Sequence, residues 1–314
     1  MKKIKIILTN ILITGATGFI GSNLVHQLVK SKDKISIFTH KKSNMKYIKN
    51  IISKLDIHEV DFCEYALIQE KIKKIKPDIV YHLATYGVLS NQTEFDNIIQ
   101  TNVLGTLNLF NALSEYGCVN KVVNVGSSFE YKPKSTKIKN TDETNPQTVY
   151  GFSKVCQTNI AKYFYEQKDL PVITLRIFNA YGPFENKNRL IPSFMLSALN
   201  HKKIYIKNPN NIRDFIFVKD VVESLISASK VKKSGKILNI GTSNGYSVRE
   251  IVKKLSNITK YYNIVFCESK TQEYAGKIVA DITKSKRILK WEPKYSVDEG
   301  LRETFEFLKQ TITL

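Results

Sequence analysis

Residues 10–21 read Asn-Ile-Leu-Ile-Thr-Gly-Ala-Thr-Gly-Phe-Ile-Gly: a short apolar run leads into three glycines, and an amphipathic helical pattern follows at once. Gly15 permits a tight turn, Gly18 lets a pyrophosphate approach the backbone, and Gly21 lets the helix pack closely on the strand. The N–H groups at the helix start then face the anion. The stretch therefore predicts dinucleotide binding. Three residues between the glycines are expected to contact the cofactor as well: Thr17, Phe19 and Ile20.

The chain of 314 residues has a formal net charge of +20, from 48 basic and 28 acidic residues. Such a balance permits a nucleic-acid partner. The lysines, however, are spread along the whole chain, as on solvated faces. We therefore expect no nucleic-acid partner, and we expect the positive charge to attract substrates and cofactors that carry phosphates.

Nothing in the composition predicts a membrane or metal protein. No apolar run approaches the roughly 18 residues of a membrane span. The lysines and short apolar run before residue 9 precede no small-residue cleavage site, so the first nine residues are expected to be an extension rather than a targeting signal. The four cysteines form no CxxC pair, and the five histidines have no metal-ligand spacing. These features predict a cytoplasmic protein with reduced cysteines and no metal.

Strand and helix patterns alternate through the first half of the chain. Strands are predicted at 11–14, 35–39, 56–60, 78–83, 121–126 and 171–177, and helices at 18–31, 64–75, 95–116 and 149–168. Such alternation predicts a parallel sheet with helices on both faces, and ligands bind at the carboxyl ends of its strands. The predicted fold class is α/β, a Rossmann-type doubly wound parallel sheet.

The alternation ends after about residue 178, where loops separate shorter elements. This break predicts a smaller C-terminal substrate-binding lobe that ends in a helix at 296–310. The expected division gives residues 1–178, with about 212–240 returning, to the dinucleotide-binding domain, and 179–211 and 241–314 to the lobe.

Tyr150 and Lys154 stand four residues apart in the predicted helix 149–168, which puts both on one face with Cβ atoms about 6 Å apart. A free tyrosine loses its proton near pH 10, but a neighbouring ammonium and an oxidised nicotinamide both favour the phenolate. Tyr150 would then move a proton to or from a sugar hydroxyl. Ser128, after the fifth strand, would donate a hydrogen bond to the same oxygen. The alternative is a surface tyrosine and lysine on an amphipathic helix.

With these residues the chain resembles, over nearly its whole length, the extended short-chain dehydrogenase/reductases of the nucleotide-sugar epimerase/dehydratase type. The matching landmarks are residues 15–21, Asp61, 82–84, Asn102, 126–128, 150–154, 176–183, 213–218, 239–241 and 291–293. The resemblance implies a nicotinamide cofactor and a nucleotide-diphosphate sugar, bound by the C-terminal lobe. It also implies a homodimer through helices 95–116 and 149–168, whose apolar residues include Val103, Leu107, Phe110, Ile160 and Phe164.

The resemblance assigns single residues to the cofactor. Asp61 and Phe62 would flank the adenine, and Leu83 and Ala84 would pass under the nicotinamide. Tyr150 and Lys154 would contact the cofactor too. Asn102 would brace the active-site helices, and His82 is expected to pack under the end of the sheet rather than act as a base.

The resemblance also assigns residues to the substrate: Tyr86, Ser128, Asn179 and Arg213. Asn179 and Arg213 would hold the diphosphate, and a planar guanidinium suits phosphate oxygens. Purely structural roles stay open for both residues: Asn179 as a turn residue, and Arg213 in a surface salt bridge with Asp214.

The second predicted strand departs from the pattern of NAD-preferring relatives. It is followed by His40-Lys41-Lys42, where those relatives usually carry an acid for the ribose 2′-hydroxyl. Basic side chains there would hold a 2′-phosphate, so His40 and Lys41 are assigned to the cofactor. The expected cofactor is NADP(H), with NAD as the alternative. The basic residues could also form a solvated turn that contacts no cofactor.

A second departure concerns Ser128-Phe129-Glu130. In relatives, Ser/Thr-x-Glu occurs in 4,6-dehydratases, decarboxylases and some 4-ketosugar reductases. Dehydratases with an adjacent Asp-Glu pair have an acid for water loss, and Phe129 stands at the first of those places. Glu130 is either a structural carboxylate or a base, and it is kept with Ser128, Tyr150 and Lys154 as a catalytic candidate.

These observations lead to one main expectation for function. The chain is expected to be an NADP(H)-dependent oxidoreductase that reduces a 4-keto-6-deoxy sugar carried on a nucleotide diphosphate. A 4-epimerase and a 4,6-dehydratase share the same catalytic residues and are the alternatives. A non-catalytic NAD(P)-binding regulator is the alternative from another class.

Overall fold

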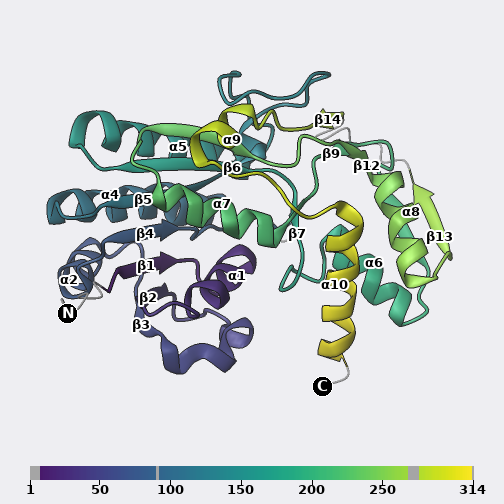
Figure 1. Cartoon of the computed structure of the whole chain (residues 1–314), viewed down its shortest axis with the longest axis horizontal. Coiled ribbons are helices and arrows are strands. Elements are labelled where there is room, and N and C mark those ends of the chain that lie inside the picture. The colour runs from purple at the N-terminus through teal and green to yellow at the C-terminus, as the bar shows by residue number, and fades with distance from the viewer. Residues whose placement is uncertain (1–7, 90–91, 268–275, 313–314) are drawn as a thin grey trace, which may run out of the picture. The chain divides into compact units, whose positions relative to one another are not determined.

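The computed structural model describes residues 8–89, 92–267 and 276–312 (Figure 1), so most of the expected N-terminal extension lies outside the described residues. Seven strands form the main sheet: β1 Asn10–Thr14, β2 Lys34–Thr39, β3 Asp56–Glu59, β4 Ile79–His82, β5 Lys121–Ser127, β6 Val172–Ile177 and β11 Lys236–Ile240. Their order is β11-β6-β5-β4-β1-β2-β3. β1 pairs in parallel with β2 and β4, β2 with β3, and β4 with β5. This is the doubly wound order, and the predicted fold class is confirmed.

The chain divides into two compact units. The first comprises Met1–Val125, Ser153–Thr174 and Ala228–Lys236, and the second comprises Gly126–Phe152, Leu175–Ser227 and Ile237–Leu314. These bounds differ from the predicted ones, because residues 126–152 fall in the second unit. Of the predicted returning segment 212–240, the stretch Ala228–Lys236 falls in the first unit. Which ligand each part binds stays a prediction.

Three helices cover one face of the first unit's sheet: α2 Tyr65–Ile75, α4 Gly105–Tyr116 and α5 Val149–Lys168. Strands and helices both contribute buried apolar side chains to this core, among them Leu12, Phe38, Val80, Val122, Ile68, Ile72, Leu109, Leu113 and Ala161. Burying one such side chain contributes about 1.5–3 kcal/mol. Helix α1 Phe19–Leu28 packs on β1 and ends three residues earlier than predicted.

The residues expected at a subunit interface divide between core and surface. Phe110 and Phe164 are 0 and 2% exposed, and their ring centroids lie 5.9 Å apart in an edge-to-face contact. They fill the core beneath α4 and α5, so the prediction that they serve an interface is wrong. Val103 and Ile160 are half-buried, whereas Leu107 is exposed.

The predicted helix 95–116 is interrupted. The structure has α3 Phe95–Ile99, a π-helical segment Gln100–Leu104 and then α4. π-Helical turns inside longer helices often mark functional sites. The helix ends at Gly117, whose φ of +71° suits a glycine C-cap.

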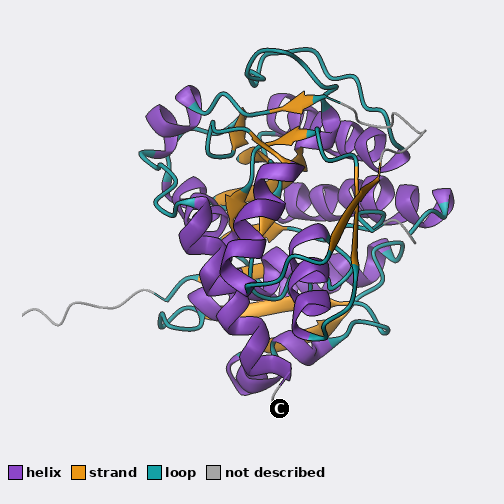
Figure 2. Cartoon of the chain, turned by 90° about the vertical axis from the view of Figure 1, so that its right-hand side faces the viewer, coloured by secondary structure: helices purple, strands orange, loops and turns teal. Residues whose placement is uncertain are grey.

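The second unit contains a group of three helices, α6 Leu190–Leu199, α8 Val248–Thr259 and α10 Val297–Ile312, which contact one another. They are labelled at the right of Figure 1, and Figure 2 views that side. Short sheets accompany them: β8 Ile204–Lys207 with β13 Ile264–Cys267, β10 Ile216–Phe217 with β7 Ala180–Tyr181, and β12 Tyr246–Ser247 and β14 Lys277–Ile278 on either side of β9 Ile212–Arg213. The remaining helices are α7 Val218–Lys230 and α9 Thr283–Leu289.

One buried carboxylate holds the C-terminal landmark in place. Asp220, in α7, accepts hydrogen bonds from the backbone N–H groups of Lys294 (2.9 Å) and Tyr295 (3.2 Å). The indole N–H of Trp291 donates to the Asp220 carbonyl oxygen at 3.1 Å. The segment around 291–293 is therefore fixed against the start of α7.

The structure can be examined for membrane-spanning helices, metal-binding groups and disulfide bonds. Within residues 8–89, 92–267 and 276–312, no helix is long and apolar enough to cross a membrane. The same residues contain no group of three or more His, Cys, Asp or Glu side chains that could hold a metal ion. All four cysteines are free thiols.

Candidate active site

In the turn after β1, neighbouring backbone atoms lie too close to Gly15 and Gly21 for a side chain at either position. Gly15 has a φ of +69°, and a Cβ there would lie 2.6 Å from the Ala84 backbone nitrogen. A Cβ on Gly21 would lie 2.1 Å from the Gly15 carbonyl oxygen. Any larger residue at either position would separate β1, α1 and the segment after β4 (Leu83, Ala84).

Gly18 plays a different part, because space lies beside it. Apart from the two chain neighbours of Gly18, the described residues bring one atom within 4 Å of a Cβ there, the Gly15 carbonyl oxygen at 3.3 Å. Gly18 precedes α1 and gives no side-chain cap to its first N–H groups. Thr17, Phe19 and Ile20 around it are half-buried. These N–H groups and the open approach fit the pyrophosphate of a dinucleotide.

A buried hydrogen-bond chain fixes the segment after β4. The Ala84 N–H donates to Thr14 Oγ1 (3.2 Å), and the Thr14 hydroxyl lies 2.8 Å from His82 Nδ1. His82 Nε2 lies 2.9 Å from Thr106 Oγ1, whose hydroxyl donates to the Asn102 carbonyl oxygen at 2.7 Å. Since Thr106 uses its proton on that carbonyl, His82 donates through Nε2 and accepts through Nδ1.

His82 is neutral in this chain. Burial, with a smaller contribution from the charge of Lys154, lowers the pKa of His82 to about 3. With both ring nitrogens engaged, His82 orients its neighbours and has no lone pair for a substrate. It packs at the end of β4 as expected.

Asn102 joins three segments of the first unit. Its Oδ1 accepts from the Tyr86 N–H (2.8 Å) and the Thr85 hydroxyl (3.2 Å). Its Nδ2 donates to the Tyr86 carbonyl oxygen (2.8 Å) and to Ser153 Oγ (2.9 Å). The π-helical segment thus links the loop after β4 to α5, which is the bracing role expected for Asn102. The Tyr86 hydroxyl donates to Glu94 at 2.8 Å.

The predicted adenine and ribose residues lie after β3 and β2. Asp61 is exposed, and its Oδ1 accepts from the Cys63 N–H at 2.8 Å. The Phe62 ring centroid lies 6.1 Å from that of His82. His40 and Lys41 form an exposed turn, in which the Lys42 N–H donates to His40 Nδ1 at 3.2 Å. Their contacts with a cofactor stay predictions.

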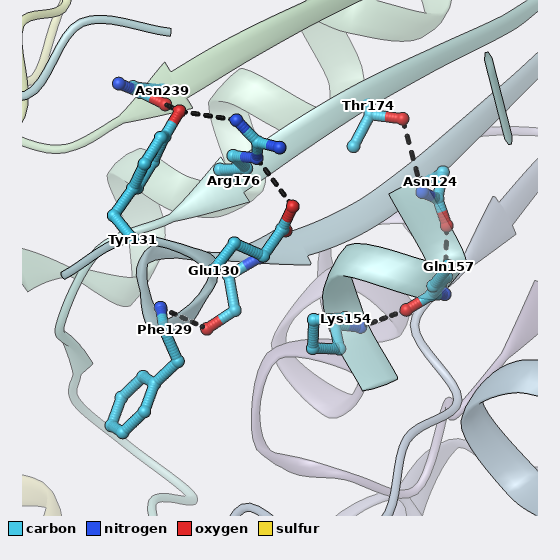
Figure 3. Close-up of polar contacts among 10 residues, drawn as sticks. Asn124, Phe129, Glu130, Tyr131, Lys154, Gln157, Thr174, Arg176 and Asn239 are labelled. Atoms are coloured by element: carbon cyan, nitrogen blue, oxygen red, sulfur yellow. Dashed lines mark hydrogen bonds and ion pairs between the residues drawn. The ribbon is translucent and has the colours of Figure 1, made fainter. Parts of the chain in front are cut away.

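Lys154 heads a chain of buried side chains in the first unit (Figure 3). Its ammonium donates to the Gln157 side-chain oxygen. Gln157 Nε2 donates to Asn124 Oδ1 at 2.9 Å, and Asn124 Nδ2 donates to Thr174 Oγ1 at 3.2 Å. None of the four residues is more than 3% exposed. An ammonium is thereby held by a neutral amide.

In the second unit, the turn that contains Ser128 contacts the start of α5 through Phe129. Ser128 begins a short 3-10 turn, Ser128–Glu130, and is buried. The Phe129 and Tyr150 rings meet edge to face with centroids 5.7 Å apart. A Cβ on Gly151 would lie 2.3 Å from the Phe129 carbonyl oxygen. The glycine after Tyr150 therefore lets α5 begin directly against this turn, and Lys154 follows one helical turn later.

Glu130 is the acceptor of a second buried network (Figure 3). Its Oε1 accepts from the Ser127 N–H at 2.9 Å, and its Oε2 accepts from Arg176 Nε at 2.7 Å. Arg176 Nη1 donates to the Tyr131 hydroxyl (2.6 Å), which donates to Asn239 Oδ1 (2.9 Å). Glu130 and Arg176 are 0 and 4% exposed. The carboxylate closes a capping box and an ion pair, which matches the structural alternative for Glu130.

The predicted substrate residues Asn179 and Arg213 are half-buried in the second unit. The Asn179 carbonyl oxygen accepts from the Ile216 N–H at 3.1 Å, and Arg213 Nη1 donates to the Gly276 carbonyl oxygen at 2.6 Å. Asp214 is fully buried, and its carboxylate accepts from groups of three other residues: Thr242, Ser243 and Ala280. Asp214 is thus a structural carboxylate, and the diphosphate roles stay predictions.

Sequence reasoning missed the partners that hold these groups. Gln157, Asn124 and Thr174 carry no motif of their own. Arg176 and Asn239 belong to matched landmarks, but without a role. A polar residue inside an otherwise apolar strand was the available signal, because buried polar groups need partners.

Comparisons with known proteins bear on this arrangement. A family model described as "NAD dependent epimerase/dehydratase family" matches residues 11–241. The dTDP-D-glucose 4,6-dehydratase of Bos taurus is 29% identical over 321 residues, covering 96% of this chain and 88% of the relative. The UDP-glucose 4-epimerase of Thermotoga maritima, solved with UDP-glucose, is 26% identical with a TM-score of 0.90, covering 97% and 100%. The dTDP-glucose 4,6-dehydratase of Bacillus anthracis, solved with NAD, is 26% identical with a TM-score of 0.88, covering 97% and 98%.

Proposed function

The chain belongs to the NAD dependent epimerase/dehydratase family, and from that premise we propose that this enzyme oxidises C4 of a nucleotide-diphosphate sugar with NAD and returns the hydride to the same sugar, as a 4-epimerase does. The sequence analysis left a 4-epimerase and a 4,6-dehydratase open as alternatives, and the relatives with these two activities support them. They give no support to its first choice, the reduction of a 4-keto-6-deoxy sugar.

The chain's own residues supply binding and proton transfer. Residues of the glycine turn would hold the pyrophosphate, and the Lys154 ammonium would favour the phenolate of Tyr150. That phenolate would take the proton of the C4 hydroxyl, and the Ser128 hydroxyl would donate to the same oxygen. When bound, NAD supplies an acceptor for the C4 hydride and can give that hydride back.

One observation favours epimerisation over dehydration. Loss of water across C5 and C6 needs a base for the C5 proton and an acid for the departing hydroxyl. Glu130 uses one oxygen on Ser127 and the other on Arg176. Phe129, at the place of the acid, has no proton to give. A 4,6-dehydratase is the second candidate, because the bovine relative is one.

The test is the fate of deuterium placed at C4 of UDP-glucose and of dTDP-glucose, incubated with the enzyme and NAD. A 4-epimerase yields the galacto product with deuterium still at C4 and no net change in NADH absorbance. A 4,6-dehydratase yields a 4-keto-6-deoxy sugar with deuterium on C6. Conversion by neither route, with NADPH consumed only when a 4-keto-6-deoxy nucleotide sugar is added, would overturn the proposal and restore the reductase.

Cofactor choice is a separate part of the proposal. The solved dehydratase relative contains NAD, and we propose NAD for this chain. The basic turn at His40 and Lys41 favours NADP as the second candidate, because no acid there repels a 2′-phosphate. Dissociation constants for NADH and NADPH decide between them. A double change of His40→Asp with Lys41→Ala should weaken NADPH binding and spare NADH if the turn holds that phosphate.

The quaternary and domain assignments are also proposals. Leu107 on α4 and Tyr163 on α5 are 41 and 50% exposed, and we propose that these helices pair in a homodimer. Leu107→Asp should then lower the mass seen by light scattering at micromolar concentration. Tyr205→Asp, at a 63% exposed aromatic of the second unit, is the control. The C-terminal lobe, with Asn179 and Arg213, would hold the nucleotide sugar.

A further inference from the structure

The hydrogen-bond partner of Lys154 is a buried glutamine, and its position suggests a functional role as well as a packing role. The ammonium donates to Gln157 Oε1, three residues further along α5. Gln157 reaches Asn124 on β5, and Asn124 reaches Thr174 on β6, at 2.9 and 3.2 Å. The four residues are buried, with exposed fractions of 1, 0, 0 and 3%. Three secondary-structure elements therefore contribute to holding one side chain.

The direction of this chain is fixed by its first member. An ammonium can only donate, so Gln157 must present its oxygen to Lys154 and its NH2 to Asn124. Asn124 must then present its oxygen to Gln157 and its NH2 to Thr174. Reversing Gln157 would break two hydrogen bonds and reversing Asn124 would break the one to Gln157, in a buried place where an unmade bond is costly.

We propose that Gln157 is a positioning residue: its neutral amide, oriented by Asn124 and Thr174, holds the Lys154 ammonium in place without cancelling its charge. The amide adds no charge of its own, so the Lys154 ammonium would act on Tyr150, one helical turn earlier on α5. This inference rests on the proposed acid–base roles of Tyr150 and Lys154.

The proposed role of Gln157 depends on its side chain being uncharged. A carboxylate at position 157 would form an ion pair with Lys154, and the pair would exert a much smaller field on Tyr150. The phenol would then keep its proton to a higher pH. A glutamine accepts the same hydrogen bond in the same shape with no net charge.

Two titratable neighbours of Lys154, His82 and Cys156, keep one protonation state over the acidic range of a rate profile. His82, on β4, is neutral because burial and the charge of Lys154 lower its pKa to about 3. Cys156, on α5, keeps its proton because burial raises the pKa of its thiol. Asn124 on β5 and Thr174 on β6 do not titrate. We therefore assign a shift in the acidic limb to Tyr150, and the Tyr150→Phe variant checks that assignment.

The test compares pH profiles of turnover, with saturating NAD and the nucleotide sugar that the wild-type enzyme converts. Gln157→Glu should move the acidic limb upward by one pH unit or more. Activity would fall at least 10-fold at pH 7 and recover toward the wild-type rate as the pH rises. Gln157→Met should lower turnover at every pH and leave the limb in place, because it removes the hydrogen bond without adding charge.

Two further variants test whether the shift depends on a carboxylate placed beside Lys154. Gln27→Glu is the matched control, since Lys30 donates to Gln27 at 3.0 Å with the same three-residue spacing on an exposed face; it should keep the wild-type profile. Asn124→Asp puts the carboxylate one link further away and should shift the limb in the same direction by less. It carries the test if Gln157→Glu does not fold.

The outcomes separate this inference from the proposed function. If Tyr150→Phe is inactive and Gln157→Glu keeps the wild-type acidic limb, the positioning role is overturned and the proposed acid–base pair stands. If Tyr150→Phe retains wild-type turnover, the proposed function itself fails. A loss that does not recover at high pH in Gln157→Glu would reduce Gln157 to a packing residue.

Discussion

Lys154 and Arg176 are both buried cations, and the protein treats them in opposite ways (Figure 3). Arg176 meets the carboxylate of Glu130 at 2.7 Å and forms an ion pair with it. Lys154 meets the amide of Gln157, which carries no charge. An ion pair cancels most of its own field, whereas an amide holds a cation and leaves its field in place. The comparison supports a structural role for the first network and is the basis of the functional role that we propose for the second.

Breaking the ion pair should have the largest effect on stability. Glu130→Ala leaves the Arg176 guanidinium buried without its carboxylate, which typically costs about 3–5 kcal/mol. It also removes the acceptor for the Ser127 N–H. We expect a loss of that size in urea unfolding. The double variant Glu130→Leu with Arg176→Met should recover most of it. A loss below about 1 kcal/mol in Glu130→Ala would contradict the structural role.

Removing the other cation should affect rate more than stability. Lys154→Met leaves Gln157 with an unused oxygen but no buried charge, so we expect the unfolding free energy to change by about 1 kcal/mol. Turnover should fall by about 100-fold or more, because Tyr150 loses the charge that favours its phenolate. Tyr262→Phe, at a 63% exposed tyrosine of the second unit, is the control and should change neither quantity. Equal losses of stability in Lys154→Met and Glu130→Ala would erase the contrast.

Glu185 is a third buried charge and an intermediate case. Its Oε1 lies 3.6 Å from Arg189 Nε, and its buried Oε2 has no hydrogen-bond partner among the residues that the structure describes. Burial raises the pKa of Glu185 to about 7. The folded state therefore binds this proton more tightly than the unfolded state. The stability it contributes is fully present below about pH 4.5 and is lost as the pH rises through about 7.

Glu185→Gln should reveal that loss. The variant and the wild type should have similar unfolding free energies at pH 5, and the variant should be more stable at pH 8 by about 1–3 kcal/mol. Glu166→Gln, at an exposed carboxyl 3.9 Å from Lys162, is the control and should show no such dependence. A variant less stable than the wild type at pH 8 would mean that the ionised carboxylate is satisfied after all.

The sheet was predictable from sequence because its signals are local. The predicted strands agree with β1 to β6 within two residues, since apolar runs and turn residues mark strand ends directly. The glycine turn was predictable for the same reason: Gly15 and Gly21 are required by close contacts within the strand–turn–helix unit or just after β4, and Gly18 leaves space beside the same turn.

The two buried networks could not be predicted in this way. Gln157 and Asn124 are 33 residues apart and Asn124 and Thr174 are 50 apart, so no window of sequence contains both partners. The π-helical segment at Gln100–Leu104 was read as continuous helix, because a π turn changes hydrogen bonding without changing the apolar pattern. Phe110 and Phe164 were read as interface residues because apolar helix positions do not say whether core or surface lies against them.

The most direct measurement of the central claim is a titration of Tyr150 itself. The ultraviolet absorbance of phenolate is followed against pH in wild-type enzyme with NAD bound, and the curve of Tyr150→Phe is subtracted. If the uncancelled charge of Lys154 acts on Tyr150, the difference curve shows a pKa well below the ordinary value of about 10, and Lys154→Met moves it back upward. A difference curve with its midpoint at 10 or above, unchanged by Lys154→Met, would contradict the account.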